Sequence, residues 1–375
     1  MNILILSWRD PKHPQAGGAE QVMHEHMKGW IAAGHTVTFF SSRSRGSKAE
    51  EWLDGIRIIR RGSDLFLGVQ LEAFWWYLFT DHEKFDLVVD EFHGYPFFTP
   101  LFTRIPKLAV LQEVAREVWF LNYLPWPWRW IIGFIGYWTE PLVFLLYKKT
   151  PFLVGSLSAK QDLMSFGVPQ KNISIVPHGI IKTEKPVNIP RKEERKTIIF
   201  LGALTTDKGI EEALEAFGIL QKKGNYNFWI VGRGEPLYIK KLKNGCKRLG
   251  VINNTTFFGF VSQKRKFQLL GRAHILINPS IREGWGLVNI EANAMGTPVV
   301  AYKSPGLVDS VNDGRSGLLC KENTPKDIAK MVTMLLENNK LYTNLQKGAV
   351  EWSKRFSWEK SKKLSLDLIE RIDEN

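Results

Sequence analysis

The chain has 375 residues, of which 44% are hydrophobic and 24% charged, a composition typical of a globular protein rather than of a disordered one. This length exceeds the size at which one hydrophobic core stops growing, so we expect two domains. The two cysteines provide no disulfide framework and suit a reducing compartment. The net charge of +13 is uneven: residues 1–178 carry 18 basic and 17 acidic side chains, and residues 179–375 carry 33 and 21.

The first half alternates apolar runs with helical patterns. The start of the chain lacks a basic segment and has too short an apolar run for a signal peptide, so we interpret Ile3–Ser7 as a buried strand. A second apolar run, Val37–Ser41, follows a helical stretch from about Ala19 to Ala33. This strand–helix–strand unit places Gly17 and Gly18 where the first strand passes into its helix. Further strands are expected at Ile56–Arg60, Leu87–Val89, Leu108–Leu111 and Phe152–Gly155.

The stretch from Trp119 to Tyr147 is unusually rich in aromatic residues. Glu140 and Pro141 interrupt its longest apolar run, which argues against a transmembrane helix. Clustered Trp and Tyr closed by Lys148-Lys149 favour a helix that lies in a lipid headgroup layer. The alternative is a helix pair that packs between domains or covers the core.

A second α/β pattern follows a polar stretch, residues 182–196, which contains nine charged side chains and is interpreted as a linker. The pattern restarts with the apolar run Thr197–Gly202. Later strands are expected at Phe228–Val231, Thr256–Phe258, His274–Asn278 and Val299–Tyr302. The alternation predicts two doubly wound α/β domains that face each other across a cleft.

The most informative run contains two glutamates, Glu283 and Glu291, eight positions apart. An apolar strand, Ile275–Ile277, precedes a glycine-bearing turn and a helix from about Leu287 to Met295. The first-turn N–H groups of that helix suit a phosphate, and the two carboxylates suit hydroxyl groups. A sugar joined to a ribose through a diphosphate has all of these parts. The alternative is a helix with a favourable N-terminal acid and one exposed glutamate.

Glu283 and Glu291, followed by Ala-x-Ala-x-Gly-Thr-Pro, resemble the donor-site signature of the family 4 retaining glycosyltransferases, which have the GT-B fold of two Rossmann-like domains. Other stretches match this family in the same order: 17–20, 154–158, 166–169, 176–180, 200–202, 208–209, 231–234, 306–310 and 313–317. The resemblance covers nearly the whole chain. It implies an acceptor-side domain at residues 1–181, a linker at 182–196 and a nucleotide-sugar donor domain at 197–356. The last helix, residues 357–375, is expected to pack back on the first domain.

The resemblance also assigns roles to residues. Glu283 is expected to contact the transferred sugar, Glu291 the ribose hydroxyls, and Lys208 the leaving diphosphate. Carboxylates accept hydrogen bonds from vicinal hydroxyls, which supports the first two roles. The remaining donor-binding candidates offer backbone that a ligand can approach closely: Gly17, Gly18, Gly202, Gly232, Gly286, Leu287 and Val288. The chain contains no Asp-x-Asp motif, so we expect no metal and no cofactor besides the nucleoside-diphosphate sugar as co-substrate.

Two positions depart from the family pattern. Ala203 stands where an arginine usually follows the glycine, so one cation of the usual pair is missing, and Arg233 or Arg282 can substitute for it only if the fold brings one of them near. Gln112 stands where a histidine is expected near the sugar. A glutamine can hydrogen-bond a sugar hydroxyl but cannot accept a proton at neutral pH.

The sequence therefore predicts a retaining glycosyltransferase of the hexosyltransferase type, acting on a lipid-linked or cell-envelope glycan. We expect it in the cytoplasm, peripherally at the inner face of the cell membrane. The basic stretch Lys240–Arg272 is either solvated surface or a contact for anionic lipid; without a recognised binding module we expect no nucleic-acid partner. The alternatives are a nucleotide-sugar epimerase on the same fold and a sugar-nucleotide-binding protein without turnover. The residues do not specify the donor base and sugar, the acceptor or the oligomeric state.

Overall fold

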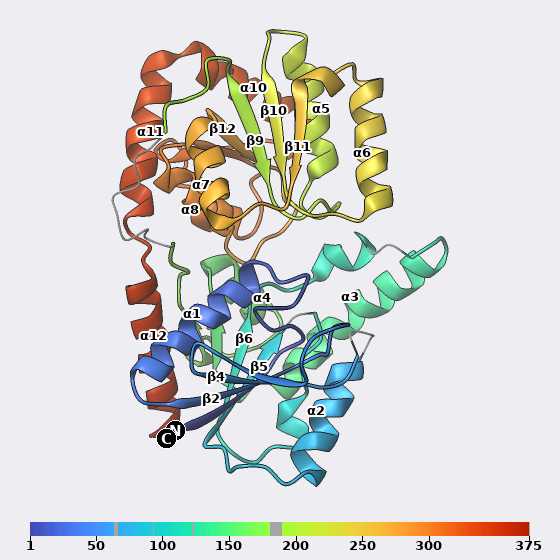
Figure 1. The fold of residues 1–375 in the computed structure, drawn as a ribbon, viewed down its shortest axis with the longest axis vertical. Helices are drawn as coiled ribbons and strands as arrows, with labels where there is room; N and C mark the ends of the chain where they lie inside the picture. The colour runs from blue at the N-terminus through green and yellow to red at the C-terminus, as the bar shows by residue number, and fades with distance from the viewer. Residues whose placement is uncertain (64–66, 93, 122–123, 181–189, 375) are drawn as a thin grey trace. The chain divides into compact units, whose positions relative to one another are not determined.

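The computed structural model describes residues 1–374 except 64–66, 93, 122–123 and 181–189 (Figure 1). Two compact units are present: one contains Met1–Gly179 and Trp358–Asn375, and the other contains Ile180–Ser357. We call them the N-unit and the C-unit. Each is built on its own largely parallel sheet covered by helices.

The sheet of the N-unit has the strand order β3-β4-β2-β1-β5-β6-β7-β8, and its pairs are parallel except for β3 with β4. Its central strands are apolar runs buried on both faces, as parallel sheets require. The strands are β1 (Asn2–Leu6), β2 (Thr36–Ser41), β3 (Glu50–Leu53), β4 (Ile56–Arg60), β5 (Leu87–Phe92), β6 (Lys107–Leu111), β7 (Phe152–Val154) and β8 (Ile173–Ile175). The six strands predicted from apolar runs are confirmed, whereas the edge strands β3 and β8 were not anticipated.

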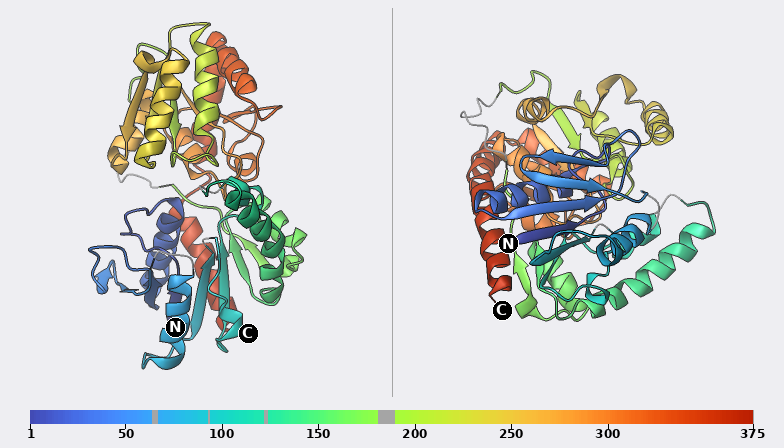
Figure 2. Two further views of the ribbon diagram at one scale, coloured as in Figure 1. Left: turned by 90° about the vertical axis from the view of Figure 1, so that its right-hand side faces the viewer. Right: turned by 60° about the horizontal axis from the view of Figure 1, so that its bottom comes forward.

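Among the described residues, five α-helices belong to the N-unit, and the last of them comes from the other end of the chain (Figures 1 and 2). They are α1 (Gly18–Ala32), α2 (Gly68–Phe79), α3 (Trp128–Leu146), α4 (Leu157–Ser165) and α12 (Trp358–Asp373), with short 3-10 helices η1 (Thr99–Leu101), η2 (Arg116–Leu121) and η3 (Gln170–Asn172). Helix α12 packs against α1. His26 Nε2 lies 3.0 Å from Ser361 Oγ, and Trp30 Nε1 donates to Ser365 Oγ at 3.2 Å.

The sheet of the C-unit has the strand order β11-β10-β9-β12-β13-β14, and all of its pairs are parallel. The strands are β9 (Thr197–Leu201), β10 (Asn227–Val231), β11 (Thr255–Gly259), β12 (Ile275–Asn278), β13 (Val299–Ala301) and β14 (Gly317–Leu319). The helices are α5 (Ile210–Gln221), α6 (Pro236–Arg248), η4 (Ile252–Asn254), α7 (Gln263–Arg272), α8 (Leu287–Ala294), α9 (Leu307–Ser310), α10 (Pro325–Glu337) and α11 (Asn339–Ser353). Of these strands, only β14 was not predicted.

Most of the predicted linker, residues 182–189, lies outside the described residues. The part that follows is attached to the C-unit. Lys192 Nζ donates to the carbonyl of Ala273 and to Thr297 Oγ1, both at 2.7 Å, and Glu193 N donates to the carbonyl of Arg272 at 3.0 Å. The described part of the predicted linker is therefore held against the C-unit by hydrogen bonds.

The length and hydropathy of the helices test whether the aromatic stretch can span a membrane. Within the part of the chain that the structure describes, no helix is both long enough and apolar enough to cross a membrane.

Candidate functional site

The candidate site of the C-unit lies where its strand order reverses. The chain builds β10 and β11 on one side of β9, and then β12, β13 and β14 on the other. In such sheets ligands bind at the carboxyl ends of the strands beside this reversal, because the two flanking loops diverge there. The two loops are Gly202–Gly209, after β9, and Pro279–Gly286, after β12. They contain Lys208 and Glu283, which were predicted from the sequence as site residues.

Lys208 and Glu283 are in contact. Lys208 Nζ lies 3.2 Å from Glu283 Oε2, and each side chain is about one fifth exposed. Ser280 Oγ donates to Glu283 Oε1 at 3.0 Å. A cation and a carboxylate are thus held side by side at the carboxyl ends of the central strands β9 and β12, where both are partly exposed to solvent.

A buried hydrogen-bond network, which was not predicted from the sequence, holds Ser280, the residue that contacts Glu283. Ser280 N and Oγ both contact Asn278 Oδ1, at 3.2 and 2.8 Å. Asn278 Nδ2 donates to Asn289 Oδ1 at 3.0 Å, and Asn289 Nδ2 donates to Ser310 Oγ at 2.9 Å. The network joins β12 to α8 and α9. Its one sequence signal is Asn278, a polar residue at the end of an apolar strand.

Two glycines let the backbones of the site approach each other closely. Gly232 has φ +152°, and a Cβ there would overlap the carbonyl oxygen of Gly202. Gly306 has φ +77°, and a Cβ there would overlap the carbonyl oxygen of Glu283. Gly202 and Gly232, both predicted donor-binding residues, are therefore brought together at the ends of β9 and β10.

Helix α8 begins where the sequence predicted. Gly286 is its N-cap with φ 78°, and Leu287 and Val288 are its first residues. Their N–H groups belong to the first turn, which has no acceptors within the helix and carries the positive end of its dipole. Glu291 lies further along the helix, with a side chain 2% exposed, and is ion-paired with Lys266 of α7. The basic stretch Lys240–Arg272 is therefore not wholly solvated surface.

The two arginines that could replace the missing cation at Ala203 have different surroundings. The Arg233 guanidinium carbon lies 3.7 Å from the centroid of the Phe260 ring, a cation–π contact at the ends of β10 and β11. Arg282 is buried, with 6% of its surface exposed.

In the N-unit, Gly17 and Gly18 begin α1 after the loop that follows β1. Gly17 is the N-cap, and its N–H donates to Glu20 Oε2 at 2.7 Å. Arg9 Nε lies 2.9 Å from Glu20 Oε1. An ion pair therefore shapes this glycine turn.

A second buried acid lies near this turn, at the end of β5. Glu91 is 1% exposed, and among the described residues neither of its side-chain oxygens has a hydrogen-bond partner within normal geometry. Burial, assisted by the Glu20 carboxylate, raises the pKa of Glu91 to about 8, although Ser7 and Arg9 act in the opposite direction. At neutral pH this side chain is mostly a neutral acid.

Gln112, predicted to occupy the position of a family histidine, directly follows β6 and contacts a histidine. His178 Nε2 lies 3.2 Å from Gln112 Oε1, and a Cβ at position 155 would overlap the His178 ring. Burial lowers the pKa of His178 to about 4, so the imidazole is neutral and its Nε2–H can donate to the Gln112 carbonyl. The structure thus places Gln112, Gly17 and Gly18 in the N-unit and the remaining predicted site residues in the C-unit.

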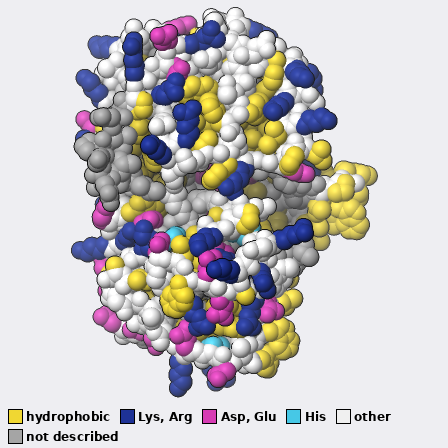
Figure 3. All heavy atoms as spheres, in the orientation of Figure 1, with side chains coloured by type: hydrophobic (Ala, Val, Ile, Leu, Met, Phe, Trp, Pro, Cys, Tyr) yellow, Lys and Arg dark blue, Asp and Glu magenta, His cyan; other side chains and the backbone are white. Residues whose placement is uncertain are grey.

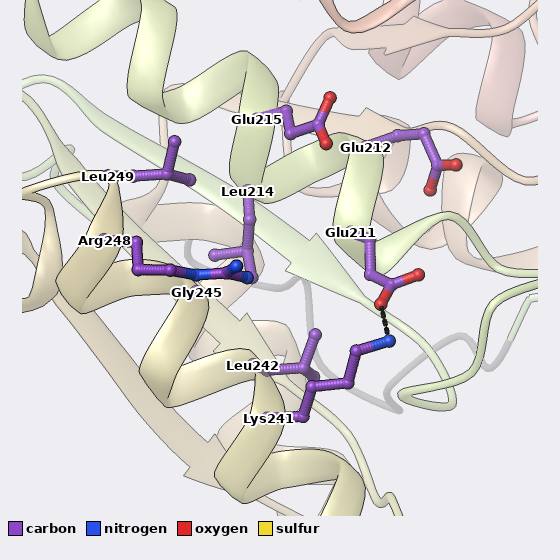
Figure 4. Close-up of a pocket in the computed structure, with 9 residues that line it drawn as sticks. All are labelled: Glu211, Glu212, Leu214, Glu215, Lys241, Leu242, Gly245, Arg248 and Leu249. Atoms are coloured by element: carbon purple, nitrogen blue, oxygen red, sulfur yellow. Dashed lines mark hydrogen bonds and ion pairs between the residues drawn. The ribbon is translucent and has the colours of Figure 1, made fainter.

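A hollow of about 590 Å³ lies between α5 and α6 (Figure 4). Lys241 Nζ lies 2.7 Å from Glu211 Oε1 at its edge. No predicted site residue lines it; the lining residues are Glu211, Glu212, Leu214, Glu215, Lys241, Leu242, Gly245, Arg248 and Leu249. Within the described residues no cluster of three His, Cys, Asp or Glu side chains is arranged to hold a metal ion.

Helix α3 has an inverted amphipathic pattern. Along most of the helix the residues that face the protein are small or polar: η2 covers Gly133 and Gly136, and Glu140 accepts hydrogen bonds from the N–H groups of Ala115 and Arg116 at 2.6 and 2.8 Å. Near the C-terminal end, Phe144 is buried in the apolar core. Large apolar side chains cover the outside of the helix, where they form the yellow projection in Figure 3. We call this set the α3 surface: Trp128, Trp130, Ile131, Ile132, Phe134, Ile135, Trp138, Leu142, Leu145 and Leu146.

Two family models match the chain. The model for Glycosyltransferase Family 4 matches residues 16–183, and the model for Glycosyl transferases group 1 matches residues 181–352.

Curated relatives match over part of their length. An uncharacterized glycosyltransferase of Methanocaldococcus jannaschii is 28% identical over 240 residues, which cover 59% of this chain and 60% of that protein. D-inositol 3-phosphate glycosyltransferase 2 of Catenulispora acidiphila is 37% identical over 144 residues, 38% of this chain and 33% of its own. The matched stretches thus span less than two thirds of these relatives.

Solved structures match over the whole chain. Sucrose-phosphate synthase of Thermosynechococcus elongatus superposes with a TM-score of 0.79 at 18% identity, covering 98% of this chain and 97% of that one. WaaG, a glycosyltransferase involved in lipopolysaccharide biosynthesis, gives 0.77 at 18% identity, covering 98% and 99%. Anabaena HepE in complex with UDP and glucose gives 0.71 at 16% identity, covering 100% of both chains. At such identities the likeness concerns the fold, whereas the two family models together extend from residue 16 to residue 352, so the chain belongs to the family 4 glycosyltransferases of the GT-B fold.

Proposed function

We propose that this protein is a retaining glycosyltransferase, which moves a sugar from a nucleoside-diphosphate sugar to a hydroxyl of a lipid-linked or cell-envelope glycan. The observation that carries the proposal is the contact between Lys208 and Glu283. It lies where the strand order of the C-unit sheet reverses, beside the start of α8. A cation, a carboxylate and first-turn N–H groups together match a diphosphate joined to a sugar.

The chemistry follows from where charge develops. As the glycosidic bond breaks, the leaving diphosphate gains negative charge, and fixed positive groups that meet this charge lower the barrier. Lys208 and the N-terminus of α8 supply them. Glu283, held by Ser280, accepts hydrogen bonds from the sugar hydroxyls and so fixes the sugar relative to the phosphate. Family 4 membership and the crystallised complex of HepE with UDP and glucose support a nucleotide-sugar donor.

We propose that the acceptor lies at a membrane, because the α3 surface has the properties of a membrane-binding surface. Exposed apolar patches larger than a few hundred Å² are rare on monomeric proteins unless they meet a partner or a membrane. Exposed Trp side chains beside Arg129, Lys148 and Lys149 match the interface of a bilayer, where aromatic rings lie at headgroup level and cations meet lipid phosphates. We place the enzyme peripherally at the inner face of the cell membrane.

Incubation of the purified protein with labelled nucleotide sugars and lipid-linked acceptors tests the function. Transfer to acceptor, or slow hydrolysis of the donor, is expected. An epimerised donor would instead identify a nucleotide-sugar epimerase. Binding without either product would identify a binding protein, the outcome suggested by Ala203 and Gln112. Retention is checked by the anomeric configuration of the product, and an inverted product would contradict the proposed stereochemistry.

The donor base is found by thermal stabilisation with uridine, guanosine and adenosine diphosphates, since a ligand at about 100 times its dissociation constant adds about 2.7 kcal/mol. We propose that no metal takes part. Activity should then survive a chelator, and complete loss that magnesium restores would overturn this part of the proposal.

A further inference from the structure

Lys266 lies in the first turn of α7 and contacts Glu291, the residue that the family resemblance assigns to the ribose hydroxyls. Its Nζ lies 2.5 Å from Glu291 Oε1. The carboxylate is 2% exposed and the lysine side chain 16% exposed, so the pair is largely removed from water. Removing one partner of such a pair leaves a buried charge, which is strongly unfavourable.

The sequence around Lys266 is unusual for the beginning of a helix. Helix α7 starts Gln263-Lys264-Arg265-Lys266, with Ser262 as its N-cap and no acid in its first turn. Cations are unfavourable at this end, because it carries the positive end of the helix dipole. Lys264 is exposed and the Arg265 guanidinium contacts Gln268, whereas Lys266 meets a buried carboxylate. The ion pair with Glu291 offsets the unfavourable location of this one cation.

Lys266 donates a hydrogen bond to only one of the two carboxylate oxygens of Glu291, Oε1. Among the residues that the structure describes, Oε2 has no hydrogen-bond partner. An ionised carboxylate has about four acceptor positions on its two oxygens, so the contact with Lys266 leaves room for two hydroxyl donors. A vicinal diol supplies two hydroxyl donors.

We propose that Lys266 is a positioning residue for donor recognition: it holds the Glu291 carboxylate in place so that this group receives the two ribose hydroxyls. The inference rests on the proposed nucleotide-sugar donor and adds a consequence to it. Lys266 then determines how strongly the site prefers a ribonucleotide to its 2′-deoxy counterpart, although it contacts neither the base nor the sugar that is transferred.

Calorimetric titration tests this with the nucleoside diphosphate that stabilises the wild type most and with its 2′-deoxy form. Lys266→Met should weaken binding of the ribonucleotide by about tenfold or more, since the hydrogen bonds to a charged acceptor are lost. Binding of the deoxy form should change much less, so the preference for ribose falls toward one. Lys266→Arg should retain the preference. Lys264→Met, which removes an exposed cation from the same turn, is the matched control and should leave both affinities unchanged.

The outcomes separate the possible errors. An equal loss of affinity for both nucleotides in Lys266→Met would mean that Lys266 acts on the diphosphate, and the inference fails. An unchanged preference also overturns it. If Lys266→Met does not fold, the double variant Lys266→Met/Glu291→Gln, in which the buried carboxylate is replaced by a neutral amide, should fold and show little preference; retained preference contradicts the inference. If the wild type binds no nucleoside diphosphate, the proposed function falls, and the inference with it.

Discussion

Lys208 and Glu283 neutralise each other in the structure, so a bound donor has to engage both. The diphosphate is expected to interact with Lys208 while the sugar hydroxyls interact with Glu283. The support of Glu283 by Ser280 keeps the carboxylate in place when the lysine turns toward phosphate. Glu283 is therefore held in place before a donor binds, whereas Lys208 has to exchange its carboxylate partner for phosphate.

Replacing Lys208 by alanine should lower turnover much more than it raises the Michaelis constant for the donor. The reason is that the contact between the ammonium group and the phosphate strengthens as charge develops in the transition state. Steady-state kinetics on the folded variant measure both constants. An effect confined to the Michaelis constant would show that Lys208 stabilises only the ground state.

Replacing Glu291 by alanine should weaken binding of a nucleoside diphosphate, because the ribose hydroxyls lose a charged acceptor worth roughly 1.5–3 kcal/mol. Calorimetry measures the affinity, and circular dichroism confirms that the variant is folded. Since Lys266 would lose its partner, Glu291→Gln is the better-matched second variant. Unchanged affinity in both would remove Glu291 from the site.

Glu91 makes the stability of the protein depend on pH. Its folded pKa of about 8 lies above the ordinary value of 4.5, so between these values the native state binds more protons than the unfolded state. Stability contributed by this group is then present below pH 4.5 and falls as the pH rises toward 8, by at most about 1.4 kcal/mol per pH unit. Glu91→Gln, which cannot ionise, should raise the thermal midpoint more at pH 8 than at pH 5. An equal change at both values would contradict the raised pKa.

At the scale of elements, the sequence pattern of α3 predicts a helix but does not predict which of its faces points outward. The aromatic run predicted a helix, and the helix is present at Trp128–Leu146. Glu140 interrupts the apolar run in the sequence, and in the structure it accepts hydrogen bonds from the N–H groups of Ala115 and Arg116, which holds the face with Glu140, Gly133 and Gly136 toward the protein. This interaction turns the apolar face outward.

The α3 surface should bind the protein to bilayers. Trp, Phe and Leu side chains supply apolar area for the interface, and the nearby cations each add about 1 kcal/mol at an anionic surface, an increment that salt screens. Sedimentation with neutral and anionic liposomes measures binding, which Trp130→Ser/Trp138→Ser/Leu142→Ser should abolish. Leu237→Ser, which removes an exposed apolar side chain from α6, is the control.

Two results would contradict this docking surface. If the wild type stays in the supernatant with both kinds of vesicle, the segment packs against protein and the acceptor is better sought among soluble glycans. If binding requires anionic lipid and vanishes at high salt, the basic stretch Lys240–Arg272 becomes the docking surface. Because Lys266 already pairs with Glu291, the exposed lysines of α6 would then be the residues to replace.

At the scale of the molecule, the chain leaves the N-unit near Gly179 and returns to it with α12. This helix completes the core under α1: Ile369 is fully buried and Leu368 is 5% exposed, both in contact with residues of the N-unit sheet. Lys362 adds an ion pair with Glu25 at the edge of the contact. The C-unit is therefore inserted, in sequence terms, into the N-unit.

Ile369→Ala should destabilise the N-unit by about 2–5 kcal/mol, the usual cost of removing a buried isoleucine side chain beyond Cβ. Asp367→Ala, an exposed change on the same helix, should have little effect. Hydrogen exchange resolved by peptide distinguishes the units, since the two need not unfold together. Faster exchange confined to the C-unit would show that α12 does not stabilise the sheet of the N-unit.

The sequence by itself determined the strands that are continuous apolar runs, the glycine positions between strand and helix, and the family. These features are local, because burial on both faces demands apolar side chains and a tight turn demands glycine. Only the tertiary structure decided which distant groups meet. The pairing of Lys266 with Glu291, the network from Glu283 through Asn278 to Ser310 and the outward face of α3 all depend on strand order and helix packing. The edge strand β3 was missed for the same reason, since its pairing with β4 depends on a partner strand and not on a run of buried residues.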